Sequence, residues 1–172
     1  HRLVNPTLSA PAALVQFLEP WSHLYGDSTL IATIVEFSHI AALVLAGGLA
    51  VTLDRATLRA VRAPATRSRQ LDDLAAAHKV VVTGLAFSVV TGLLLFTADI
   101  EAHFVSWIFW TKMGLVALLL SNGYVMTRTE ADLRLASANA DRGWGRLRIS
   151  AVVSLALWFA IAFAGVALVN AG

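Results

Sequence analysis

The sequence predicts an all-α fold, a four-helix transmembrane bundle with a short N-terminal interfacial helix. Of the 172 residues, 58% are hydrophobic and 14% are charged, whereas about a quarter of the residues in a typical soluble domain are charged. Four apolar stretches are each at least about 20 residues long, which is enough helix to cross about 30 Å of hydrocarbon. The third and fourth stretches lack the polar stripe of a soluble helix. Residues 1–172 are therefore expected to form a single integral membrane domain.

The first 29 residues are expected to contain a helix that lies on the membrane surface. Ser9 is suited to cap this helix, Pro11 to occupy its first turn and Pro20 to end it. Its apolar side chains lie on one face, and it is too short to cross the membrane. Trp21 would then sit in the headgroup layer. The segment lacks the basic start and the long apolar core of a secretory signal.

The four spans follow in chain order at residues 30–53, 74–98, 105–127 and 149–169. They are rich in Ala and Leu, and a helix satisfies its own backbone hydrogen bonds, as hydrocarbon requires. The connections 54–73 and 128–148 carry ten of the thirteen basic residues, while residues 99–106 carry none. Because basic connections stay in the cytoplasm, both termini are expected outside, in the periplasm of a bacterium whose inner membrane holds the protein. Because membrane topology explains where the basic residues lie, they do not indicate a nucleic-acid partner.

Several kinds of chemistry are excluded by composition. The chain contains no cysteine, so it has no disulfide, thiolate metal site, iron–sulfur cluster or covalent c-type haem. We find no phosphate-binding loop and no nucleophile accompanied by a base, which sets aside kinase and hydrolase chemistry. Whether the protein is an enzyme stays open at this level.

Ionisable residues inside the spans carry most of the functional information, because they are costly in hydrocarbon and usually face the bundle interior. Glu36, His39 and Lys112 are expected at one level, with His39 and Lys112 about 13 and 10 Å below the outer boundary. His78 is expected about 6 Å from the inner boundary, near Asn122. The sequence therefore predicts an outer polar cluster and an inner one.

A non-covalent b-type haem is one interpretation of these histidines, since neutral imidazole is a common axial ligand of haem iron. His39 and His78 are the candidate iron ligands, with Lys112 and Glu36 as further cofactor-binding residues. The expected difference in depth makes joint ligation of one iron by both histidines unfavourable. Small residues on both helices would admit a flat porphyrin, although such stripes also let membrane helices pack closely. These residues are Ala42, Ala46, Gly47, Gly48 and Ala50 in the first span, and Gly84, Ser88, Thr91 and Gly92 in the second.

Two other interpretations of the outer cluster are open. Glu36 and His39 form a Glu-x-x-His pair, which is half of a carboxylate-bridged di-iron site, but the sequence offers no second pair. Glu36 and Lys112 would alternatively form a buried salt bridge of purely structural value. His23 and His103 lie outside the spans and are most simply surface residues.

Three segments resemble a group of small bacterial inner-membrane proteins with four spans. They are Phe37-Ser38-His39-Ile40 followed by a glycine-rich stretch and Asp54-Arg55, Thr91-Gly92-Leu93-Leu94-Leu95-Phe96-Thr97-Ala98-Asp99, and Phe109-Trp110-Thr111-Lys112-Met113. In layout the chain is similar to copper-resistance-D-like membrane proteins and to the haem-dependent membrane protoporphyrinogen oxidases. The resemblance implies a haem at His39 with Lys112 near a propionate or a substrate carboxylate. Gly123-Tyr124-Val125 stands where a later span of the oxidases ends in Tyr-His.

The sequence thus predicts a b-type cytochrome-like membrane subunit for electron transfer, with haem b as cofactor and a quinone as a candidate redox partner. Its expected surroundings are the lipid bilayer and other membrane subunits. The alternative is a cofactor-free accessory subunit that holds a larger respiratory or photosynthetic complex together. A copper-transport role is a third option, although Cu(I) favours sulfur ligands and the chain has only two methionines and no cysteine.

Overall fold

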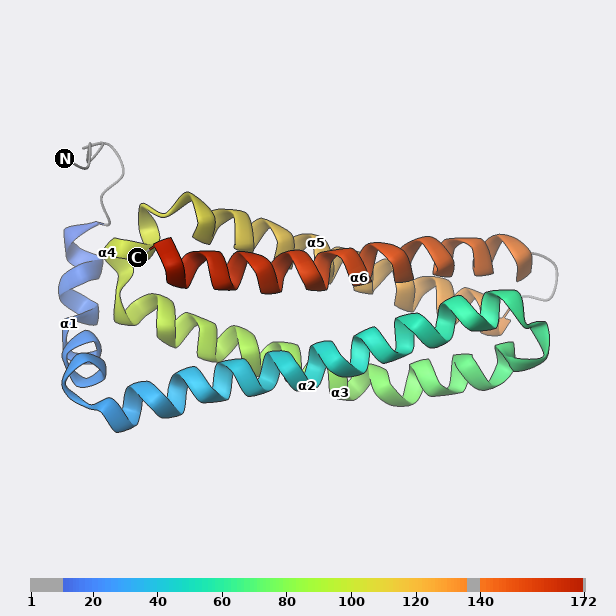
Figure 1. The fold of residues 1–172 in the computed structure, drawn as a ribbon, viewed down its shortest axis with the longest axis horizontal. Helices are drawn as coiled ribbons and strands as arrows, with labels where there is room; N and C mark the ends of the chain where they lie inside the picture. The colour runs from blue at the N-terminus through green and yellow to red at the C-terminus, as the bar shows by residue number, and fades with distance from the viewer. Residues whose placement is uncertain (1–10, 136–139, 172) are drawn as a thin grey trace.

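The computed structural model describes residues 11–135 and 140–171, and these residues form helices without any strand (Figure 1). The elements in chain order are α1 (Ala12–Asp27), α2 (Thr29–Arg62), the 3₁₀ helix η1 (Pro64–Thr66), α3 (Arg67–Ala98), α4 (Ile100–Phe104), α5 (Trp107–Leu135) and α6 (Ala140–Ala171). Helices α2, α3, α5 and α6 are long and apolar enough to cross a membrane, and the four predicted spans lie on them. The expected all-α bundle is confirmed, and its form is that of a multi-pass membrane protein.

The long helices extend past the expected spans. Helix α2 has 34 residues, which corresponds to about 51 Å of helix against about 30 Å of hydrocarbon. Residues 54–62 continue α2, residues 67–73 begin α3 and residues 128–135 continue α5, so the expected connections are largely helical. Hydropathy marks where an apolar segment ends, whereas Ala, Leu and Arg in these connections are good helix formers that continue the helix. Residues 136–139 of the second connection lie outside the described residues.

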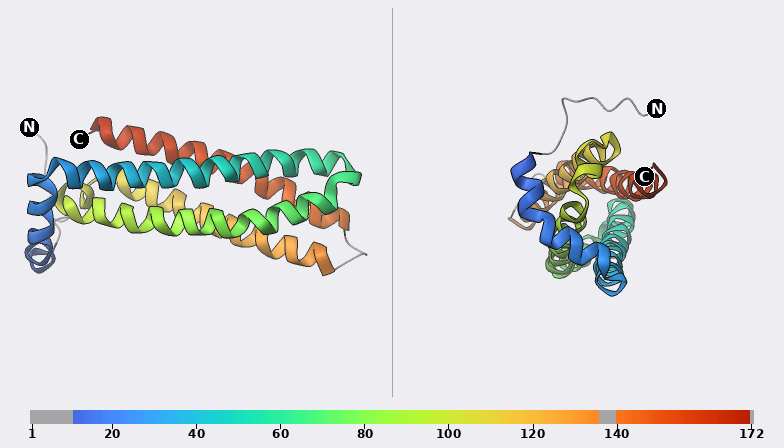
Figure 2. Two further views of the ribbon diagram at one scale, coloured as in Figure 1. Left: turned by 90° about the horizontal axis from the view of Figure 1, so that it is seen from below. Right: turned by 90° about the vertical axis from the view of Figure 1, so that its left-hand side faces the viewer.

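Helix α1 lies across one end of the bundle, near the C-terminal end of α6 (Figures 1 and 2). We call this end the α1 end, and the opposite end, which contains the turn from α2 to α3, the η1 end. The helix begins directly after Pro11, while Ser9 lies outside the described residues. The prediction that Pro20 ends the helix is wrong, because the helix continues to Asp27.

Contacts with α3 stabilise the part of α1 that follows its proline. An internal proline removes one backbone hydrogen bond from a helix. The next two residues donate side-chain hydrogen bonds to α3: Trp21 Nε1 to the Leu94 carbonyl oxygen at 3.0 Å, and Ser22 Oγ to that of Ala98 at 2.7 Å. The second bond satisfies a carbonyl at the end of α3 that has no partner within its own helix.

The four long helices form two hairpins, α2 with α3 and α5 with α6, which join mainly through α2 and α6. The central contact cluster consists of Ala46, Leu119, Trp158 and Ile161. Helices α2 and α6 therefore form the spine of the bundle. Helices α3 and α5 lie at its edges, where their backbones seldom approach each other and side chains join them, such as the stacked rings of Phe96 and Phe109.

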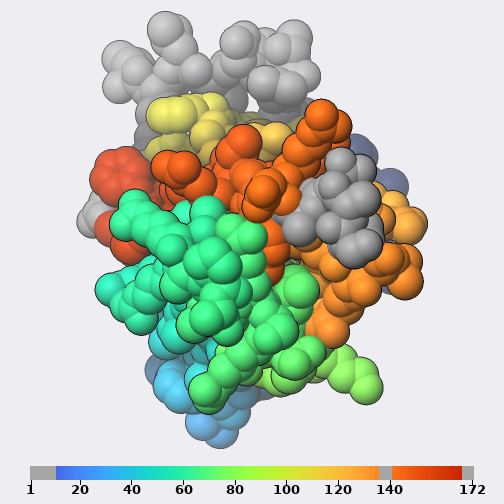
Figure 3. Space-filling view, turned by 90° about the vertical axis from the view of Figure 1, so that its right-hand side faces the viewer, coloured from blue at the N-terminus to red at the C-terminus, as the bar shows by residue number. Residues whose placement is uncertain are grey.

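At the η1 end, two arginines tie the hairpins together. Arg67 at the start of α3 donates to the Val61 carbonyl oxygen at 3.1 Å, pairs with Asp141 of α6 at 3.3 Å and lies over the buried Trp144 ring. Figure 3 shows this end, where the turn between α2 and α3 lies beside the first turns of α6.

Arg134 of α5 makes the second tie. It pairs with Asp72 of α3 at 3.2 Å, donates to the Leu71 carbonyl oxygen and pairs with the buried Glu130 of its own helix at 3.1 Å. We call these contacts of Arg134 the latch. They hold the two edge helices together at the η1 end.

Candidate functional site

The His39 ring of α2 is half-buried and fixed by α3. Its Nδ1 atom lies 3.0 Å from the Ser88 carbonyl oxygen and 3.1 Å from Thr91 Oγ1. Because a carbonyl oxygen only accepts, Nδ1 carries the hydrogen, and the neutral ring presents its lone pair at Nε2. No hydrogen bond among the described residues engages Nε2. The bond at one ring nitrogen thus sets the tautomer that a metal or a proton donor would meet at the other.

Close packing of small residues positions this histidine. A methyl group on Gly92 would lie 3.1 Å from Cε1 of His39, and one on Gly84 would lie 2.9 Å from Cβ of Ala46. The two small-residue stripes therefore pack α2 against α3 and leave no space for a porphyrin between these helices. Any planar group bound to Nε2 has to lie outside the contact between α2 and α3.

Lys112 of α5 lies outside that contact. Its side chain is half-buried, and Nζ lies 3.8 Å from the position of a methyl group on Gly165 of α6. Lys112 is close enough to His39 for the two groups to interact electrostatically. The structure therefore brings together two members of the predicted outer cluster, carried by opposite hairpins.

Glu36, the third member, is directed elsewhere. Its side chain is exposed, and Tyr25 of α1 donates a hydrogen bond to Oε1 at 2.8 Å. No ion pair joins it to Lys112 in the part of the chain that the structure describes, so the expected buried salt bridge is wrong. The cause is that the turn between α1 and α2 places Tyr25, near the end of α1, beside Glu36. Burial, then the hydrogen bond to Glu36 and the charge of that carboxylate raise the pKa of Tyr25 to about 12.

His78 lies well away from His39. It is ten residues before Ser88, the level at which His39 contacts α3, and this corresponds to about 15 Å along the helix. That separation is too large for two ligands of one iron. His78 is exposed and lines a second feature, a cavity of about 360 Å³ between the two hairpins that we call the inner cavity.

Asp54, which the sequence analysis placed in a connection, is a buried residue of the inner cavity. Its side chain is 3% exposed, and the Ser154 hydroxyl of α6 hydrogen-bonds to its carboxylate. The second carboxylate oxygen, Oδ2, has no hydrogen-bond partner among the described residues. The sequence contains a signal for this burial. Asp54 follows Ala50 at the same i+4 spacing that links Ala42, Ala46 and Ala50, so it lies on the same face of the helix.

Asn122, expected near His78, also lines the inner cavity, and its Nδ2 atom donates to the Ser150 carbonyl oxygen at 2.9 Å. The rest of the lining is mostly apolar and comes from all four long helices, including Leu53, Val81, Leu85, Leu119 and Trp158. The cavity is thus an apolar space with a few polar groups, the usual character of a small-molecule site.

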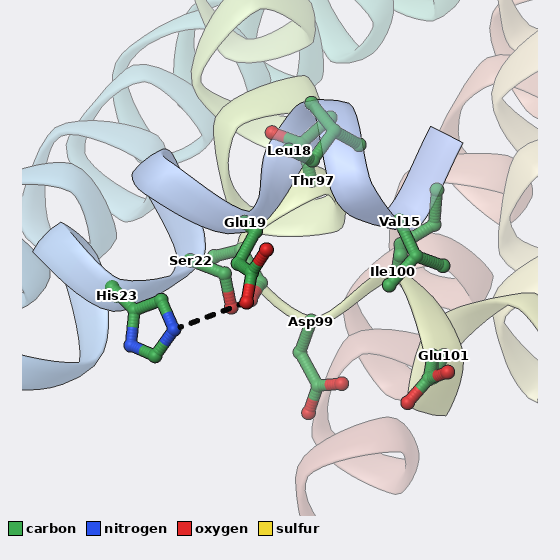
Figure 4. A pocket seen from close by; sticks show the side chains of 10 residues that line it. Val15, Leu18, Glu19, Ser22, His23, Thr97, Asp99, Ile100 and Glu101 are labelled. Carbon is green, nitrogen blue, oxygen red and sulfur yellow. Dashed lines mark hydrogen bonds and ion pairs between the residues drawn. The ribbon is translucent and has the colours of Figure 1, made fainter. Parts of the chain in front are cut away.

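A smaller pocket of about 150 Å³ lies at the α1 end, between α1 and the turn from α3 to α4 (Figure 4). Glu19, Asp99 and Glu101 surround it, all of them exposed, and His23 lies 3.7 Å from Glu19. Within the described ranges, no three His, Asp or Glu side chains are grouped so that they could hold a metal ion. No protein family, curated protein or solved structure matches the chain.

Proposed function

We propose that the protein is a multi-pass membrane subunit that transfers electrons through a non-covalent b-type haem, with His39 as an axial ligand. The observation that carries this proposal is the hydrogen bond from His39 Nδ1 to the Ser88 carbonyl oxygen. Metal-binding histidines typically donate their second ring nitrogen to a carbonyl or carboxylate, which orients the ring and fixes the tautomer. A bound haem supplies a one-electron couple.

The residues around His39 have defined roles in this proposal. His39 Nε2 would hold the iron, Ser88 and Thr91 would orient the imidazole, and Lys112, on the opposite hairpin, would pair with a propionate. His78 marks a separate inner site. We also propose that the protein belongs to the group that contains the copper-resistance-D-like proteins and the membrane oxidases. The motifs around His39 and Lys112 support this proposal.

The visible spectrum of the protein purified from haem-replete cells tests the proposal. We expect a Soret band and a reduced alpha band, and we expect His39→Ala to remove most of that absorbance per mole of protein. His103→Ala is the matched control, because His103 lies in the short helix α4, where its Nδ1 atom contacts the Asp99 carbonyl oxygen at 2.7 Å. A second haem at the inner site would give a component that His78→Ala alters separately. A colourless preparation that elutes as folded protein would contradict the proposal.

A second candidate is the cofactor-free accessory subunit. It is supported by the edge helices α3 and α5, whose outward faces carry large exposed apolar side chains such as Val80, Phe87, Leu118 and Val125. Either lipid or a neighbouring subunit would cover these faces. A colourless protein that copurifies with other membrane subunits would favour this function.

The location that we propose is a bacterial inner membrane, with the η1 end in the cytoplasm and the α1 end in the periplasm. Support comes from the arginines, since ten of the thirteen basic residues lie at or near the η1 end, on residues 55–69 and 128–148. Basic residues cluster on one side of a membrane protein because basic segments are retained in the cytoplasm.

A further inference from the structure

The inner cavity opens on the flank of the bundle. Val82 of α3 and Leu120 and Tyr124 of α5 line it, and these side chains are 47%, 48% and 61% exposed. They lie on the two edge helices, between the latch at the η1 end and the stacked rings of Phe96 and Phe109 at the α1 end. In a membrane these flanks face hydrocarbon, so a ligand reaches the cavity from the lipid.

Asp54 lines the cavity. The oxygens of a buried carboxyl group are normally satisfied by hydrogen bonds, yet Asp54 is 3% exposed, Ser154 satisfies only part of its carboxyl group, and Oδ2 has no partner among the described residues. Arg128, which also lines the cavity, is already engaged, because it donates from Nε to the Tyr124 hydroxyl at 2.9 Å and lies over its ring. The lining therefore includes a carboxyl group with an unsatisfied oxygen in a mostly apolar space.

These features define the ligand chemistry. The molecule must be soluble in the bilayer, because the access is lateral, and flat or compact enough for about 360 Å³. It must also carry a hydroxyl donor for Oδ2. A phospholipid headgroup fits poorly, since its phosphate would face the Asp54 carboxylate.

We propose that the inner cavity binds the ring of an isoprenoid quinol, with a ring hydroxyl donating to Oδ2 of Asp54 and the tail extending between α3 and α5 into the lipid. The choice of a quinol rests on the proposed electron-transfer function. The site itself, an unpartnered acceptor in a lipid-facing cavity, is defined by the geometry of the chain.

Binding is measured with the full-length protein in lipid nanodiscs, using decyl-ubiquinol as the probe under anaerobic conditions and fluorescence quenching as the signal. Trp158 lines the cavity, so Trp158→Phe identifies the share of the signal that comes from it. Asp54→Asn should weaken binding about tenfold, a change of the size expected when one hydrogen bond is lost. Asp73→Asn is the control, with the same charge change at an exposed residue of α3.

A second pair of variants tests the route and does not depend on Asp54. Leu120→Trp narrows the mouth of the cavity and should also weaken binding, whereas Leu118→Trp, on the same helix but outside the cavity lining, should not. The proposal is overturned if the wild-type protein shows no saturable quenching, or if Asp54→Asn and Leu120→Trp both bind as the wild type does. The visible spectrum of the same sample reports on the haem separately. Quenching without a Soret band contradicts only the proposed function, and a Soret band without quenching contradicts only the quinol site.

Discussion

Single glycines decide how closely the helices approach. Gly84 of α3 faces Ala46 of α2, and Gly47 of α2 faces the Trp158 ring of α6, where an added methyl group would lie 3.0 Å from two ring carbons. Gly48, next in the chain, has no such neighbour within 4 Å. The glycines of α2 therefore have different roles even though they are adjacent.

Gly84→Ala should destabilise the protein by about 1–3 kcal/mol, the usual cost of overpacking a close contact, because the Ala46 methyl group is fixed to its backbone and cannot turn away. Gly48→Ala is the matched control and should be neutral or stabilise by about 0.5–1 kcal/mol, since alanine is the better helix former. The measurement is the free energy of unfolding in mixed micelles with increasing dodecyl sulfate. Equal effects of the two substitutions would show that α2 and α3 are not in this register.

At the same scale, the sequence predicts more of the packing than of the polar contacts. The stripes of small residues in the first two spans correctly mark a close helix interface. The partners of Glu36 and Asp54 do not follow from the pattern, because each depends on a contact between distant segments: Tyr25 eleven residues away and Ser154 a hundred residues away. Spacing along one helix shows which face a residue shares, but not which helix covers that face.

Among the elements, α1 depends most on such distant contacts, since none of its residues is fully buried. Three side chains, Trp21, Ser22 and Tyr25, hydrogen-bond it to α2 and α3. Sequence reasoning correctly predicted a helix outside the spans. The end of that helix was predicted at Pro20, because the hydrogen bonds that Trp21, Ser22 and Tyr25 make with other helices do not follow from the local sequence.

The docking of α1 should weaken at high pH. The folded-state pKa of Tyr25 is about 12, above its ordinary value of 10.0, so its contribution to docking is fully present below pH 10 and is lost as the pH rises to about 12. The absorbance at 295 nm follows tyrosine ionisation. When the pH titration of Tyr25→Phe is subtracted from that of the wild type, the remaining absorbance change should have its midpoint near pH 12. Tyr124→Phe serves as the control. A midpoint near pH 10 in the difference would mean that Tyr25 does not contact Glu36 in solution.

On the scale of the whole molecule, charge is sorted between the two ends. The segment 99–106 at the α1 end contains no Lys or Arg, whereas the segments 55–69 and 128–148, at or near the η1 end, contain ten arginines. Hydropathy was sufficient to predict four spans, because spanning length and apolarity are properties of local sequence. It could not predict that the hairpins meet along α2 and α6, which depends on the fit of Ala46, Gly47 and Trp158.

Reporter fusions test the orientation that follows from this sorting. A phosphatase fused after Glu101 should be active, because that enzyme needs the periplasm, and a fluorescent protein fused after Arg62 should be bright, because its folding needs the cytoplasm. Exchanging the two reporters provides the control, since both signals should then be lost. A fusion at Glu101 that behaves as cytoplasmic would reverse the proposed orientation.

The two hairpins of the bundle are joined mainly along one line, the contact between α2 and α6. Each hairpin packs more closely within itself than against the other hairpin. The edge helices are tied at both ends, by the latch at the η1 end and by the stacked rings of Phe96 and Phe109 at the α1 end, whose centroids lie 4.8 Å apart. A molecule that enters or leaves the inner cavity through the flank between these helices would therefore pass between the two ties, and no helix would have to unwind.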